Sequence, residues 1–130
     1  MGERIRLLAE IVGAYLCTRR ALARAPIAAV VSEQRAQRSR SPPGRSDDPL
    51  VEARHLGSAV TRTLALLPGD TRCLARSLVL IRLLARRRIP ARLVIATRTT
   101  PSFAAHAWVE HAGLPVLPPG DSSFGRIVEL

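Results

Sequence analysis

The apolar periodicity of the chain changes once, at Ile89-Pro90, and this change constrains the fold more than any other feature. Before that point, apolar residues recur at the three- and four-residue spacing of helices. After it they form short runs separated by Pro and Gly, a pattern typical of strands and turns. A length of 130 residues suits a single compact domain over residues 1–130. We therefore predict an α+β fold, with helices first and a small antiparallel sheet after them.

The first part of the chain, residues 1–67, is predicted to be helical. Pro26 is expected to divide the opening helical segment into two helices, because proline removes a backbone donor. Residues 38–48 combine Ser, Pro, Gly and charged residues, which predicts an exposed and flexible linker. Asp48 and Pro49 then provide an N-cap and a first helical residue, so another helix is predicted to begin there.

A further helix is predicted from Thr71 to about Arg87, with Asp70 as its cap and Cys73 in its first turn. Four apolar residues are predicted to line one face of this helix: Leu74, Leu78, Ile81 and Ala85. Short apolar runs then predict four strands: Leu93–Ala96, Ala104–Glu110, Leu114–Leu117 and Arg126–Leu130. His106 lies on the second of these strands.

The chain has two cysteines, Cys17 and Cys73, and no secretory pattern at its N-terminus, so we expect a cytoplasmic protein without disulfides. A thiol in the first turn of a helix lies near unpaired N–H groups and the positive end of the helix dipole, which favour the thiolate. Cys73 and His106 are therefore a candidate nucleophile and base. On position alone, the pattern favours a small buried hydrophobe at Cys73 over a nucleophile. Cys17 lies in an apolar helical stripe and is assigned to packing.

The charge balance narrows the possible partners. Lys and Arg number 20 against 10 acidic residues, so the net charge of +10 predicts attraction to an acidic partner, or simply a solvated arginine-rich surface. Aromatic residues make up only 3% and do not interleave with basic runs, so nucleic acid is not an expected partner. The cysteines and histidines lack metal-ligand spacing, and we expect no zinc site and no other cofactor.

The region from Arg72 to the end of the chain resembles a known family. The likeness is carried by RCLARSL around Cys73, RIPARLVI at 88–95, PSFAAHAWVE around His106, and RIVEL at 126–130. These segments resemble lasso-peptide biosynthesis B2 proteins, which are leader peptidases with a transglutaminase-like fold. The resemblance implies a catalytic core over residues 68–130, with Cys73 as the nucleophile and His106 as the base that activates it.

The resemblance also implies an acidic third member that orients the histidine. In the family this residue usually follows on the next strand, but Leu117-Pro118 occupy that region here. Three side-chain carboxylates follow His106: Glu110, Asp121 and Glu129. Asp121 is the candidate, because Glu110, although on the same strand face, lies about 13 Å along the strand from His106. An Asp after Pro-Pro-Gly is also ordinary turn chemistry, so this assignment stays open.

The function implied by the resemblance is that of a cysteine peptidase that removes the leader peptide from a ribosomally synthesised lasso-peptide precursor before macrocyclisation. The implied partners are the leader region of the precursor, a separate B1-type leader-recognition protein and the lasso cyclase. Two other classes stay open. One is a transglutaminase-like acyltransferase, in which an amine replaces water. The other is a non-catalytic basic adaptor or membrane-surface protein that uses the N-terminal helices, although a membrane partner is not the expected one.

Overall fold

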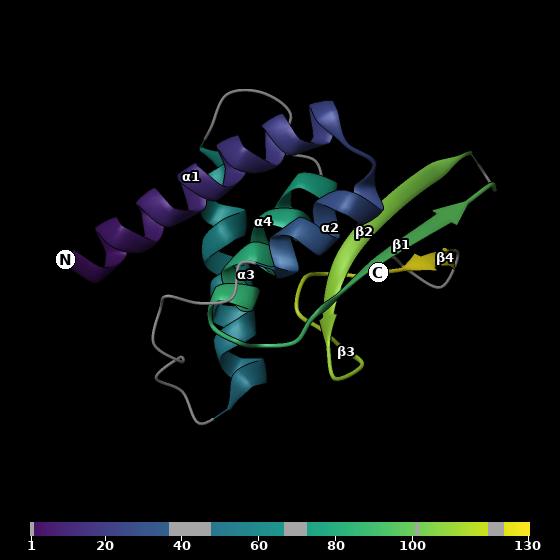
Figure 1. The fold of residues 1–130 in the computed structure, drawn as a ribbon. Helices are drawn as coiled ribbons and strands as arrows, with labels where there is room; N and C mark the ends of the chain where they lie inside the picture. Colours follow the sequence, from purple (N-terminus) through teal and green to yellow (C-terminus); the bar gives the residue numbers. More distant parts are fainter. Residues whose placement is uncertain (1, 37–47, 67–72, 101, 120–123) are drawn as a thin grey trace.

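The computed structural model describes residues 2–36, 48–66, 73–100, 102–119 and 124–130 (Figure 1). These residues form four helices followed by four strands, so the predicted α+β class is confirmed. Within the described ranges, none of the helices combines the length and apolar character needed to span a bilayer. The predicted linker lies outside the described residues except for Asp48, and the division of the chain into a helical part and a core stays a prediction.

The first two helices are α1, Gly2–Arg24, and α2, Ile27–Arg35. They separate at Pro26, whose extended backbone (φ −66°, ψ 157°) ends the helical path, as predicted. A buried hydrogen bond from Gln34 Nε2 to Thr18 Oγ1, 2.9 Å long, joins the two helices. Because both groups are removed from water, this pairing avoids the cost of burying either one alone.

The structure buries only part of the apolar stripe of α1. Residues buried on this helix are Ile11, Ala14, Tyr15 and Thr18. Cys17 is exposed, and so are three apolar residues of the same stripe: Ile5, Leu8 and Leu16. The assignment of Cys17 to packing was therefore wrong. The apolar stripe of α1 is wider than the face that packs, so periodicity alone could not select the buried half.

Helix α3, Pro49–Ala65, begins as predicted. Asp48 Oδ1 accepts a hydrogen bond from the backbone N–H of Leu50 at 3.0 Å, and proline occupies the first helical position. Pro68, Asp70 and Thr71 lie outside the described residues. Helix α4 runs over Cys73–Arg86, which confirms that the cysteine is in the first turn.

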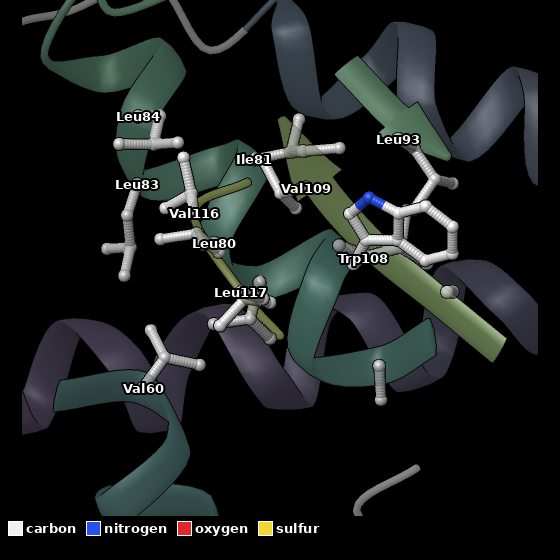
Figure 2. Packing of buried hydrophobic residues seen from close by; sticks show 14 of the residues in the cluster. Val60, Leu80, Ile81, Leu83, Leu84, Leu93, Trp108, Val109, Val116 and Leu117 are labelled. Carbon is white, nitrogen blue, oxygen red and sulfur yellow. The ribbon is translucent and has the colours of Figure 1, made fainter. Parts of the chain in front are cut away.

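Helix α4 lies at the centre of the molecule and contacts the other three helices as well as β1 and β2 (Figure 1). Eight of its residues are buried, on more than one face: Ala75, Ser77, Leu78, Val79, Leu80, Ile81, Leu83 and Leu84. The prediction of a single apolar face was too narrow, because α4 is covered both by helices and by the sheet. Figure 2 shows side chains of this core, including Val60 of α3, Leu80 of α4 and Trp108 of β2.

The sheet is antiparallel, with the order β3-β2-β1-β4. Its strands are β1, Arg92–Arg98; β2, Ala104–His111; β3, Leu114–Pro115; and β4, Gly125–Glu129. Strands β2 and β3 are joined by a turn in which Ala112 and Gly113 have φ values of 52° and 80°. Strand β3 is shorter than predicted, because Val116 and Leu117 enter the core after it. As a result, β3 covers only the last two residues of β2.

Candidate active site

Cys73 lies at the beginning of α4, and its side chain is half-buried. Its Sγ atom accepts a hydrogen bond from the backbone N–H of Ala107 in β2 at 3.3 Å. One turn further along α4, Ser77 Oγ donates to the Cys73 carbonyl at 2.7 Å and ties the first turn of the helix together. The thiol is thus held between the N-terminal end of a helix and the edge of a strand.

The Ala107 N–H is available to the thiol because of the short neighbouring strand. Strand β3 pairs only with Glu110 and His111 of β2, so no strand among the described residues lies beside the earlier part of that edge. The first turn of α4 and the segment after β3 cover this part of the edge instead. That segment follows β2 through a hydrogen bond from Val116 N–H to the Val109 carbonyl, 2.8 Å long.

The His106 ring is contacted on several sides. Its Nε2 atom lies 2.9 Å from the main-chain oxygen of Pro118. The ring stacks on Trp108, with ring centroids 5.7 Å apart and planes inclined by 29°. The centroid of the Phe124 ring lies 6.1 Å from that of His106. Trp108 is therefore both a buried core aromatic and a packing partner of the His106 ring.

Cys73 and His106 line the same small cavity, of about 40 Å³. The other residues that line it are Arg76, Ala107, Leu117 and Pro118. Arg76 follows Cys73 by three residues, and its Nε atom is buried without a hydrogen-bond partner among the described residues. A larger hollow, of about 1070 Å³, lies at the opposite end of α4, but neither Cys73 nor His106 lines it. The thiol chemistry therefore belongs to the small cavity.

Sequence reasoning missed three groups of this site: the Arg76 guanidinium, the Ala107 N–H and the Pro118 carbonyl. The i,i+3 spacing from Cys73 is a signal that could have indicated Arg76, because residues three apart lie on one helix face. The other two groups belong to the main chain and have no sequence signal of their own. Asp121 lies outside the described residues, so its catalytic role stays a prediction.

Glu110 has partners other than His106. Its carboxylate accepts hydrogen bonds from Trp108 Nε1 at 3.0 Å and from Arg126 at 2.8 and 3.2 Å. Burial alone would raise the pKa of Glu110, but the hydrogen bonds from Trp108 and Arg126, together with the Arg126 charge, hold that pKa below its ordinary value of 4.5. Glu110 therefore fixes Trp108, and Trp108 in turn packs against the His106 ring.

The lowered pKa of Glu110 predicts an acid-sensitive contribution to folding. The ionised carboxylate stabilises the native state fully above pH 4.5, and this stabilisation is lost as the pH falls below 4.5 and through the lower native pKa. We expect Glu110→Gln to lower the free energy of unfolding by about 1–2 kcal/mol at neutral pH, and by progressively less in acid. Urea unfolding from neutral pH down to about pH 3 measures this.

Glu129→Gln is the matched control, because Glu129 also binds Arg126 but its side chain is 42% exposed. Exposed ion pairs contribute little, so this variant should differ from wild type by less than about 0.5 kcal/mol at any pH. Equal effects of the two substitutions, or a pH-independent loss in Glu110→Gln, would contradict the prediction.

Comparison with known proteins agrees with this geometry. A family model described as the transglutaminase-like superfamily matches residues 12–129, and so includes most of the N-terminal helices as well as the sheet. Searches of curated proteins and of solved structures give no significant match. The matching superfamily consists in general of cysteine proteases and acyltransferases. With its matched region covering almost the whole chain, this protein belongs to the transglutaminase-like superfamily.

Proposed function

We propose that the protein is a cysteine peptidase that removes the leader from a lasso-peptide precursor before macrocyclisation. The observation that supports this most directly is that one cavity is lined by Cys73, at the beginning of a helix, and by His106, on the adjacent strand. A thiol and an imidazole in one cavity provide the nucleophile and the general base that acyl transfer through a thioester requires. The specific substrate class rests on the resemblance to B2 proteins.

In the proposed reaction, Cys73 Sγ attacks the peptide carbonyl carbon at the boundary between leader and core, and His106 takes the thiol proton. The C–N bond then breaks, and His106 passes the proton to the leaving nitrogen, so the core peptide departs as an amine. Water next gives a proton to His106 while its oxygen bonds to the thioester carbon. The C–S bond breaks, and the proton returns to sulfur.

Two nearby groups suit the negative charge that develops during this attack. The Cys73 N–H is at the N-terminal end of α4, where backbone donors have no acceptor within the helix. It is a natural donor to the oxyanion. Arg76 adds a positive charge to the same cavity and favours an electron-rich substrate group there.

The proposed partners follow from the same interpretation. A B1-type recognition protein would deliver the leader, and a lasso cyclase would use the released core, in the cytoplasm. The net charge of +10 supports an acidic leader or an acidic partner surface, since opposite charges steer association.

The test is a mass-spectrometric assay with a precursor peptide encoded beside this protein's gene, its recognition protein, and water enriched in heavy oxygen. We expect a free leader that carries one heavy oxygen in its new C-terminal carboxylate, because water resolves the thioester. If an added primary amine forms a leader amide in preference to the acid, the acyltransferase alternative is favoured. A precursor left intact under all these conditions would contradict the peptidase proposal.

The exposed apolar residues of α1 favour a second candidate, the non-catalytic adaptor. Ile5, Leu8 and Leu16 are 63%, 46% and 54% exposed on a helix that also carries arginines. Such a face suits a protein or membrane surface. Co-sedimentation with anionic liposomes that persists in Cys73→Ala but is lost on removal of residues 1–36 would support this candidate.

A further inference from the structure

We infer that the main-chain carbonyl of Pro118 orients His106, by holding a proton on Nε2 and leaving Nδ1 as the basic atom. This inference rests on the proposed function and deepens it. The Pro118 oxygen lies 2.9 Å from His106 Nε2. A carbonyl oxygen only accepts hydrogen bonds, so the contact requires a proton on Nε2. A neutral imidazole carries a single proton, so Nδ1 keeps its lone pair.

The carbonyl is held in place by the segment that contains it. Val116 N–H binds the Val109 carbonyl, and Val116 and Leu117 are only 8% and 7% exposed. The rings of Pro118 and Pro119 fix their φ angles, and each proline also restricts the residue before it to extended conformations. The Pro118 oxygen is therefore positioned by backbone stiffness and by burial of the residues that precede it.

The imidazole ring is held independently of the carbonyl. Trp108 stacks on it, and Phe124 contacts it at a tilt of 54°. Trp108 is itself fixed by its hydrogen bond to Glu110. Because ring and acceptor are anchored to different segments, their hydrogen bond is a preorganised contact and does not depend on one flexible side chain.

This arrangement has a chemical consequence for proton transfer. When the Cys73 proton moves to Nδ1, the ring becomes an imidazolium, and Nε2–H continues to donate to Pro118. The carbonyl dipole stabilises that cation, as a carboxylate would, but without a full negative charge. The Pro118 oxygen does not accept the proton, so the Nδ1 proton passes to the leaving nitrogen of the substrate. An orienting carboxylate is therefore not required at this site.

The test reads the His106 tautomer directly, by long-range ¹H–¹⁵N correlation spectra of the full-length protein labelled on histidine nitrogens. We expect the Nε2–H tautomer in the wild type, in Asp121→Ala and in Pro118→Ala, which keeps the main-chain carbonyl. In the double variant Pro118→Gly and Pro119→Gly the carbonyl is released. We then expect a mixture of tautomers and a loss of about tenfold in kcat/KM, which corresponds to the free energy contributed by one hydrogen bond.

Pro26→Gly is the control for general loosening of the chain, because Pro26 lies between α1 and α2 and contributes nothing to the cavity. A changed tautomer in Asp121→Ala would overturn the inference and assign the orienting role to that side chain. An unchanged tautomer in the folded double-glycine variant would overturn it as well. The tautomer is read without substrate, so this result is separate from failure of the peptidase assay.

Discussion

Cys73→Ala and His106→Ala are each expected to lower the rate of leader release by about 10³-fold or more, and the double variant should be no slower than either one. The thiol and the imidazole act as a unit in the proposed mechanism, so removing one member already removes the covalent route. Mass spectrometry of the precursor after timed incubations measures all three rates.

The chain offers a matched control for each substitution. Cys17 is exposed on α1 and His55 is exposed on α3, and neither lines the cavity. Cys17→Ala and His55→Ala should therefore retain wild-type rates. Cys17→Ala also leaves Cys73 as the single thiol, so alkylation in that background reports Cys73 alone. Undiminished leader release by Cys73→Ala would refute the peptidase proposal and favour the adaptor.

Local sequence signals predicted the order and type of the elements well. The helix break at Pro26 and the cap formed by Asp48 and Pro49 depend on atoms within one or two residues, and both are confirmed. The inner face of α1 was not predictable in the same way. Ile11 is buried and Leu16 is exposed because of where α3 and α4 pack, which is a property of the whole fold.

The site shows the same division between local and tertiary information. The resemblance and the position in a helix indicated Cys73, and the strand pattern placed His106 on a strand. The two side chains could therefore be proposed from the sequence. The main-chain groups around these two side chains could not be proposed in this way. Backbone N–H and carbonyl groups occur throughout the chain, so the sequence does not single out those of Ala107 and Pro118. Their importance comes from the shortness of β3 and the path of the segment after it.

That segment reaches the site past a glycine in α3, and this contact links core packing to catalysis. A Cβ atom on Gly57 would lie 3.1 Å from the Val116 carbonyl oxygen and 3.2 Å from Leu117 Cδ2. Both distances are shorter than ordinary van der Waals contact, and one of the two atoms belongs to the main chain. Any larger side chain at Gly57 must therefore push α3 away from residues 116–118, which carry the Pro118 carbonyl.

Gly57→Val is thus expected to destabilise the fold by about 1–3 kcal/mol, because overpacking outweighs the gain in helix propensity. It should also lower kcat/KM by about tenfold or more in the fraction that stays folded, through displacement of the Pro118 carbonyl. Urea unfolding and the leader-release assay measure the two effects. Gly13→Val is the matched control, since a Cβ on that helical glycine meets no atom within 4 Å. Similar stability and activity in the two variants would show that Gly57 does not set the position of the catalytic segment.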